Sequence, residues 1–328
     1  MKKICKLFVL VAMVFSLSSV ACAEKTLRIS LQLPMKHHLG QNLLDFQKEV
    51  EKESNGSLKI EIYPSAQLYK DKEVPQAVAS GAIEMGVASL TRFAGTIPAV
   101  DLFYVPFMFD SPEKVVKATT PGSAIRTSLD EAILGTGTRV LWWQAYGSSI
   151  LLTKKEMIKT PADMKGKKVR VFGKTLGDTV IALEGAPTMM SGSKQFLAYQ
   201  RGTVDAGMTG ITAVKSRKLY EVMDYMTLTY NADIEFIVII NEKVWQGLSD
   251  SERSIITKAG LRVEKELREK MGAIEKDTLA WAQDKIKVVD LTDAERNEWR
   301  EATKPVVNKY MERSGDLGKQ LVMEAGKL

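Results

Sequence analysis

Short strand patterns alternate with amphipathic helix patterns in the first part of the chain, and this alternation constrains the fold more than any other feature. Residues 26–33 and 58–63 alternate apolar and polar side chains as strands do, and residues 40–54 and 74–80 have helical spacing. A strand needs a long connection, usually a helix, to reach a parallel neighbour. The order strand, helix, strand, helix therefore predicts an α/β fold built on a parallel sheet.

The later part of the chain adds strands and one long helix. Residues 234–240 are almost all β-branched or aromatic, which suits a strand buried on both faces. Ser249 and Glu252 form a capping-box pattern that starts a helix running to about Lys285. Residues 204–210 carry two glycines and predict a tight connection.

The first 23 residues have the order of a secretory signal peptide. A basic start precedes an apolar run at residues 7–17, and Ala21 and Ala23 supply a small-residue cleavage motif. We therefore expect export and release as a soluble protein. A lipid anchor at Cys22 is the less favoured alternative, because a lipoprotein box has an aliphatic residue where Ser19 stands.

The mature chain that this predicts has 328 − 23 = 305 residues and no cysteine, since Cys5 and Cys22 both lie in the predicted signal peptide. Disulfides, zinc–cysteine sites and thiol chemistry are thereby excluded. Without Lys2, Lys3 and Lys6 the formal charge falls from +6 to 43 − 40 = +3, a surplus too small to indicate a nucleic-acid partner. No other apolar run approaches the ~20 residues of a membrane span.

A chain of this length is long enough for two lobes of ordinary domain size. We expect a discontinuous first lobe made of residues 24–135 plus about 215–250. The second lobe then holds about 136–214 plus part of 251–328, with the long helix packing across both lobes. Ligands of such folds bind beyond the strand ends, between the lobes.

One arginine stands out in a short apolar strand pattern at residues 165–173. Val169 and Val171 pack on one face of the predicted strand, so Arg170 leaves the other face. A guanidinium at the end of a strand is a natural bidentate clamp for a carboxylate. A structural ion pair or a solvated edge is the alternative that the local pattern leaves open.

Two consecutive tryptophans lie in a further strand pattern at residues 139–146. Trp142 and Trp143 must point to opposite faces of that strand. We expect one of them in the core and the other stacked on a ligand or lining a cleft. The alternative is that both pack in the core.

Four segments, in order and at family-like spacing, resemble the solute-binding proteins of tripartite ATP-independent periplasmic (TRAP) transporters, the family named for C4-dicarboxylate binding. The likeness runs from about Thr26 to Tyr310. The segments are residues 62–68, 160–171, 185–187 and 198–205.

The resemblance implies a two-lobed, clam-shell binding protein of the periplasm with long C-terminal helices. Such a protein closes on one small molecule and delivers it to the small and large TRAP membrane subunits, which an ion gradient drives. It implies no enzymatic activity and no cofactor, and we expect a monomer. The resemblance also implies that Arg170 forms the salt bridge to the ligand's carboxylate.

Departures from the family pattern narrow the range of possible ligands. Ile150 stands where many relatives have a second pocket arginine, and Thr209 stands where relatives that recognise polar acids have an amide. Losing a cation and an amide while gaining Ile150 and Met208 favours a monocarboxylate with a less polar body. If Arg92 replaces the missing cation, a dicarboxylate is again a candidate ligand.

Further ligand-binding candidates follow from position in the matching segments, and Ile150 and Thr209 are counted with them. Each has a structural alternative: a bond to nearby backbone, a surface ion pair or a place in the core. The additional candidates are Gln32, Ser89, Arg92, Trp143, Phe172 and Phe236.

The two histidines, His37 and His38, are adjacent and follow the first strand. Adjacent side chains rarely face one site, so we expect no metal site there and assign the pair a capping or solvent-exposed role.

Two other classes of function stay open. A ligand receptor of a sensor system shares the same fold. A secreted enzyme is less favoured, because the chain lacks a cysteine nucleophile, a Gly-x-Ser-x-Gly elbow and metal-ligand spacing.

Overall fold

The computed structural model describes residues 24–328, so the predicted signal peptide and Cys22 lie outside the described residues. Two sheets share one long strand, β4 (Thr138–Thr153). The first half of β4 pairs with β9 (Asp233–Asn241), and its second half pairs with β7 (Ala206–Gly210). The fold is therefore two-lobed and of α/β type, as the alternation of patterns predicted.

The first sheet has the strand order β2-β1-β3-β9-β4. Its N-terminal strands pair in parallel, whereas β9 runs antiparallel to both of its neighbours. The strands are β1 (Lys25–Ser30), β2 (Leu58–Tyr63) and β3 (Met85–Ser89), and the helices of this part are α1 (His38–Glu53), α2 (Val74–Ala79), α3 (Pro112–Thr119) and α4 (Ala124–Leu134), with the 3-10 helices η1 (Leu90–Phe93) and η2 (Pro98–Tyr104).

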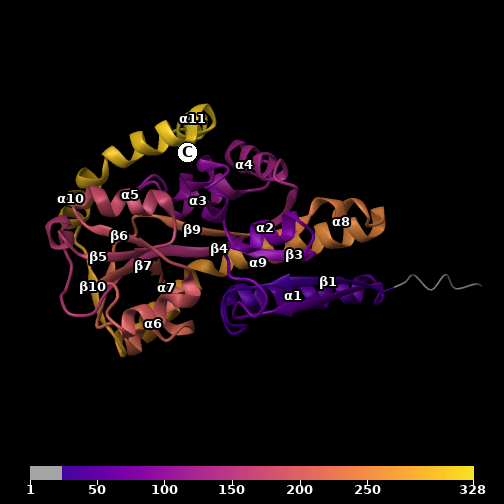
Figure 1. Cartoon of the computed structure of the whole chain (residues 1–328), viewed down its shortest axis with the longest axis horizontal. Helices are drawn as coiled ribbons and strands as arrows, with labels where there is room; N and C mark the ends of the chain where they lie inside the picture. The colour runs from indigo at the N-terminus through magenta and orange to yellow at the C-terminus, as the bar shows by residue number, and fades with distance from the viewer. Residues whose placement is uncertain (1–23) are drawn as a thin grey trace, which may run out of the picture.

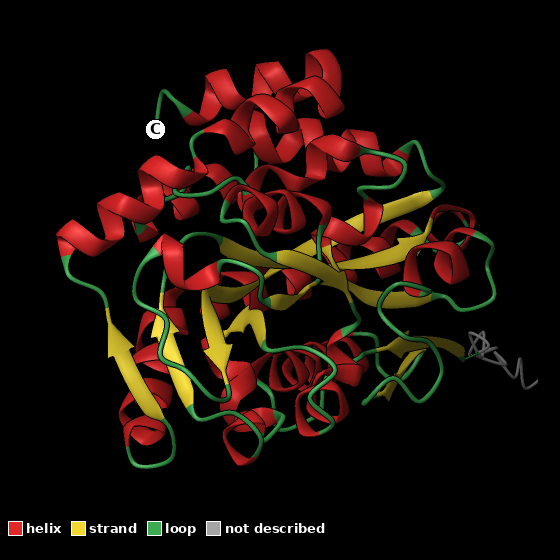
Figure 2. Cartoon of the chain, turned by 60° about the vertical axis from the view of Figure 1, so that its left-hand side comes forward, coloured by secondary structure: helices red, strands yellow, loops and turns green. Residues whose placement is uncertain are grey.

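The second sheet has the order β4-β7-β5-β6, and β8 pairs with both β4 and β10. Figure 2 shows its strands beside those of the first sheet, with helices on the outside. Its elements are β5 (Lys168–Val171), β6 (Ala186–Met189), β8 (Tyr225–Leu228), β10 (Lys287–Asp290), α5 (Lys174–Ala182), α6 (Gln195–Gln200) and α7 (Ile211–Ser216), with the 3-10 helices η3 (Pro161–Met164), η4 (Gly192–Lys194) and η5 (Leu219–Glu221).

The C-terminal helices connect the two lobes. The 34-residue helix α9 (Asp250–Gln283) contacts α1 and β4 as well as α7 and β10, so it spans both sheets. The capping box of Ser249 and Glu252 that begins it is confirmed. After α10 (Asp293–Thr303), α11 (Pro305–Ala325) packs on η2 and α5, which belong to different lobes. The short helix α8 (Glu242–Gln246) precedes α9.

Three sequence-based expectations are corrected by the sheet pairings. Residues 206–210 form β7, a buried strand, where a connection was predicted. Residues 225–228 form β8 of the second sheet, whereas the predicted boundary placed 215–250 with the first lobe. The first half of β4, assigned in advance to the second lobe, lies in the first sheet. In each case the partner strand is distant in sequence, so no local pattern records the pairing.

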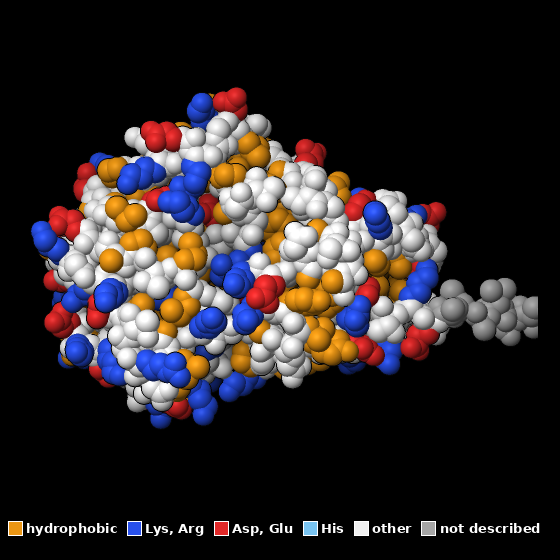
Figure 3. Space-filling model, in the orientation of Figure 1, with side chains coloured by type: hydrophobic (Ala, Val, Ile, Leu, Met, Phe, Trp, Pro, Cys, Tyr) orange, Lys and Arg blue, Asp and Glu red, His pale blue; other side chains and the backbone are white. Residues whose placement is uncertain are grey.

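On the face in Figure 3, acidic and basic side chains are interspersed. Among residues 24–328, no helix is both long and apolar enough to cross a membrane.

Candidate ligand-binding site

A small cavity lies where the two sheets meet, and both lobes line it. The first lobe contributes Gln32, Asp71, Ser89 and Arg92. The second lobe contributes Arg170, Phe172, Gln195, Thr209 and Arg217, while Tyr146 comes from β4, which joins the lobes, and Phe236 comes from β9 of the first sheet. The structure thus brings together seven of the nine residues singled out from the sequence: Gln32, Ser89, Arg92, Arg170, Phe172, Thr209 and Phe236.

Arg170 on β5 is only 2 % exposed and is held by backbone carbonyls. Its Nε and Nη2 donate to the carbonyl oxygen of Met190 at 3.1 and 2.9 Å, and its Nη1 donates to that of Met208 at 2.7 Å. A guanidinium has five N–H groups, so one N–H on each terminal nitrogen remains. Two such N–H groups form the fork that binds a carboxylate bidentately.

The charge on Arg170 is not balanced by a direct ion pair within the described residues. Burial lowers the pKa of this guanidinium to about 10, and Arg92 and Arg217 push it in the same direction, whereas Tyr199 and Asp71 oppose the shift. Arg170 therefore stays charged at neutral pH. It lies over the ring of Phe172, with 5.0 Å between the guanidinium carbon and the ring centroid.

Arg92 is already paired. Its Nε donates to Asp71 at 2.6 Å, and the two side chains are 9 % and 1 % exposed. Asp71 also accepts from the amide of Gln32 at 3.1 Å and from the hydroxyl of Ser191, which lies in the second lobe. Arg92 thus lines the cavity as predicted, but Asp71 balances its charge, and this aspartate was not foreseen.

Arg217 was missed by sequence reasoning. It lies at the C-terminal end of α7, a short helix without any local pattern that marks a ligand contact. Its Nη2 donates to the side-chain oxygen of Gln32 at 3.3 Å, across the boundary between the lobes. Gly192 leaves room for this contact, because a Cβ there would come within 2.9 Å of Arg217 and 3.0 Å of Gln32.

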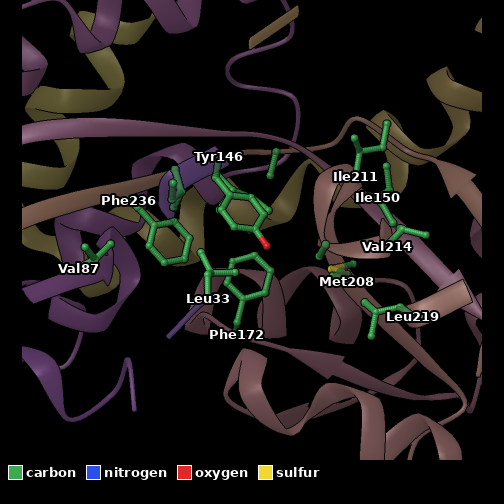
Figure 4. Close-up of a cluster of buried hydrophobic side chains, with 14 of the residues drawn as sticks. Leu33, Val87, Tyr146, Ile150, Phe172, Met208, Ile211, Val214, Leu219 and Phe236 are labelled. Atoms are coloured by element: carbon green, nitrogen blue, oxygen red, sulfur yellow. The ribbon is translucent and has the colours of Figure 1, made fainter. Parts of the chain in front are cut away.

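Aromatic rings close the side of the cavity near the lobe junction. Tyr146 stacks on Phe236 with 5.0 Å between the ring centroids, and Phe172 lies close to both (Figure 4). Burial raises the pKa of the Tyr146 phenol above its ordinary value, although Arg217 and Arg170 oppose the shift. The hydroxyl therefore stays protonated and can donate to a ligand oxygen.

Trp143 does not line the cavity, so its predicted ligand role is corrected. Its indole donates to Asp130 at 2.8 Å and meets Phe103 edge-on at 5.6 Å. Trp142 on the opposite face is equally buried and donates to Asn42 at 3.0 Å. The alternative in which both tryptophans pack in the core therefore holds.

Ile150 also lies outside the cavity, contrary to its place among the ligand-binding candidates. It pairs with Thr209 in the second sheet and lies close to Ile211 and Val214 of α7 in the hydrophobic core (Figure 4). An apolar side chain at this position packs against the adjoining helix, so it contributes no polar contact to a ligand.

The capping role predicted for the histidine pair is confirmed for His37. Its Nδ1 accepts from the backbone N–H of Leu39 in the first turn of α1, and its Nε2 lies 3.1 Å from the hydroxyl of Thr212 in the second lobe. His37 is buried, so the solvent-exposed alternative is wrong for it. In the part of the chain that the structure describes, no group of three or more His, Cys, Asp or Glu side chains is arranged to hold a metal ion.

Comparison with known proteins agrees with this two-lobed, arginine-lined architecture. A model of the family described as bacterial extracellular solute-binding protein, family 7 (DctP), matches residues 29–314. The chain belongs to this family. As a family 7 protein it is a TRAP-type solute-binding protein, so its activity is binding and not catalysis.

Relatives in this family have different named ligands. The C4-dicarboxylate-binding periplasmic protein DctP of Rhodobacter capsulatus is 28 % identical over 285 residues, which is 84 % of this chain and 83 % of the relative. The sialic acid-binding periplasmic protein SiaP of Vibrio cholerae serotype O1 is 28 % identical over 330 residues, 98 % of each chain.

Solved structures agree in fold. The sugar acid binding protein DctPAm of Advenella mimigardefordensis, in complex with galactonate, superposes with a TM-score of 0.88 at 24 % identity over 93 % of this chain and 99 % of that one. A TRAP periplasmic solute-binding protein from Ralstonia eutropha with bound (S)-2-acetolactate has a TM-score of 0.84 at 25 % identity, covering 92 % and 99 % of the two chains.

Proposed function

We propose that this family 7 protein is the extracytoplasmic receptor for a small organic acid, which it encloses between its lobes and delivers to TRAP membrane subunits. The observation that carries the proposal is the state of Arg170. This guanidinium is buried and charged, is fixed by two backbone carbonyls, and has one N–H left on each terminal nitrogen. A bidentate carboxylate satisfies both N–H groups and the charge at once. We place the protein in the periplasm, where its named relatives act.

The lining of the cavity supports a small acidic ligand. Three arginines and one aspartate line it together with the rings of Tyr146, Phe172 and Phe236, so its polar groups favour an anion. Two TRAP solute-binding proteins of this fold have succinate and (S)-2-acetolactate bound.

The proposal has two forms, in which the ligand is either a monocarboxylate or a dicarboxylate. The sequence predicts a monocarboxylate, because Ile150 supplies no second cation and Arg170 then holds the ligand alone. The Arg92–Asp71 pair is consistent with this form, since its charges cancel. A dicarboxylate requires another available cation in the cavity.

The decisive experiment screens the mature protein against small carboxylic acids by thermal shift and measures affinities by calorimetry. Arg170→Ala should remove detectable binding of every acid that stabilises the wild type. Arg170→Lys keeps the charge but loses the fork, so affinity should fall by about 100-fold or more. Arg201→Ala, an exposed arginine in the loop after α6, serves as the matched control and should bind as the wild type does.

Delivery is tested with the same ligand and variants. Proteoliposomes that contain the two membrane subunits and an ion gradient should accumulate the acid only when the wild-type protein is added. Unchanged affinity in Arg170→Ala would contradict the proposed role of Arg170 in binding. Uptake that does not require the protein would contradict its proposed role in delivering the ligand.

A further inference from the structure

We propose that Arg217 is the second ligand-binding cation of the cavity and that it makes the protein selective for acids with two negatively charged groups. This inference rests on the proposed function and deepens it. It concerns a residue outside the recognised segments, on a short helix of the second lobe.

The surroundings of Arg217 show a guanidinium whose hydrogen-bonding capacity is largely unused. Its Nη2 donates to the side-chain oxygen of Gln32 at the long distance of 3.3 Å, and its other polar neighbour is the hydroxyl of Tyr146. Its Nε is buried and has no partner among the described residues. A buried N–H without a partner is costly, which favours an acceptor supplied from outside the chain.

The position of Arg217 is nevertheless specific. Gly192 leaves space for the Arg217 side chain, because a Cβ at position 192 would lie only 2.9 Å from its guanidinium. The hydroxyl of Tyr146 lies beside the same guanidinium, which acts on the pKa of that phenol both by charge and by hydrogen bonding. These contacts hold the half-buried Arg217 at the wall of the cavity.

The charge balance of the cavity points to a dianion. Arg92, Arg170 and Arg217 line it with one carboxylate, Asp71, so the formal charge is 3 − 1 = +2. The Arg92–Asp71 pair accounts for one cation and the anion. Arg170 and Arg217 remain, and a monoanion on Arg170 would leave the half-buried Arg217 without a counter-charge at the cavity wall.

The two remaining cations also approach the ligand from different directions. Arg170 is fixed at the strand end of β5 through Met190 and Met208, whereas Arg217 comes from the end of α7 beside Gln32 and Tyr146. Both line one small cavity. A short acid with a charged group at each end satisfies both cations at once.

The test compares acids that differ in one carboxylate. Calorimetry is performed with the pairs succinate and butyrate, and 2-oxoglutarate and 2-oxovalerate. The wild type should bind the dicarboxylate of at least one pair about 100-fold more tightly than its partner. Arg217→Ala should reduce that ratio to less than about tenfold, mainly by weakening the dicarboxylate, and Arg217→Lys should restore part of it.

A purely structural role of Arg217 is separated by a second readout. Without ligand, Arg217→Ala should melt within about 2 °C of the wild type, because this half-buried side chain makes only a long hydrogen bond to Gln32 and a contact with Tyr146. A similar loss of affinity for both acids of a pair, or a ratio that the substitution leaves unchanged, overturns the inference while the proposed function stands. Failure of every acid to bind the wild type overturns the proposed function itself.

Discussion

At the scale of single residues, burial decides which side chains are charged and which are neutral. Arg170 stays charged because its shifted pKa of about 10 is still well above neutral. His38 behaves differently, since burial lowers its pKa from 6.5 to about 4 and its Nε2 donates to the carbonyl of Ala145 at 3.1 Å. Burial also lowers the pKa of His37 well below its usual value, and both rings are therefore neutral at physiological pH.

The neutral histidine makes stability depend on pH. Between about pH 6.5 and pH 4 the unfolded chain binds a proton at His38 that the folded chain does not, so folding stability falls as the pH is lowered through this range. His38→Gln keeps an N–H donor and cannot titrate. Urea unfolding at pH 7 and pH 4.5 should show a loss about 2 kcal/mol smaller for the variant than for the wild type. Parallel losses in the two proteins would contradict the assignment.

At the scale of elements, β4 carries the connection between the lobes. Ser148 still pairs with Asp233 in the first sheet, and Ser149 already pairs with Gly210 in the second. Just before this change the ladder is irregular, and Gly147 has φ of 101°, a conformation that side chains rarely adopt. Ser148 donates its backbone N–H to Glu275 on α9. The helix that spans both sheets therefore also holds β4 at the point where this strand passes from the first sheet to the second.

Gly147 is accordingly expected to be intolerant of a side chain. A Cβ there would lie 2.3 Å from the carboxylate of Glu275, in addition to the backbone strain. Gly147→Ala should lower the free energy of unfolding by about 1–3 kcal/mol. Gly272→Ala on α9 is the matched control, because no atom lies within 4 Å of a Cβ there and alanine favours a helix by about 0.5–1 kcal/mol. Equal unfolding midpoints for the two variants would show that Gly147 is not constrained.

At the scale of the whole molecule, the lobes also meet outside the cavity. Asp101 of η2 in the first lobe is fully buried and accepts from the backbone N–H and the hydroxyl of Thr175, both at 3.0 Å. Thr175 lies in the first turn of α5, whose own N-cap, Gly173, has no side chain to cap it. Arg313 of α11 donates to Asp178 and, at 2.6 Å, to Thr175. The first lobe thus caps a helix of the second.

This contact between the lobes should favour the closed arrangement without touching the ligand. Asp101→Ala leaves the N-terminal N–H groups of α5 without their partner, so the affinity for the ligand should fall by about tenfold. Calorimetry measures the effect, and small-angle scattering without ligand should show a more open molecule. Asp316→Asn, a fully exposed aspartate on α11, is the control and should change neither. An unaltered affinity in Asp101→Ala would show that the contact does not contribute to closure.

Much of this protein is determined by local sequence. The period of apolar residues predicted the α/β class, the buried strand β9 and the long helix α9 with its capping box, because each pattern records which face of one segment is buried. The same alternation placed Arg170 opposite the packed valines, and the family resemblance added the other positions that the structure gathers around the cavity.

The tertiary structure alone decided the rest, because pairing between distant segments leaves no local period. Residues 206–210 lack strand-like side chains and become β7 between β4 and β5, where Gly207 makes room for Tyr199. A large apolar side chain such as Trp143 or Ile150 packs equally well in a core or against a cleft. Only the contacts with neighbouring elements determine that both lie in the core. Asp71 and Arg217 come from segments without a motif. Asp71 meets Arg92 within the first lobe, and Arg217 meets Gln32 across the boundary between the lobes, and these tertiary contacts set the charge of the site.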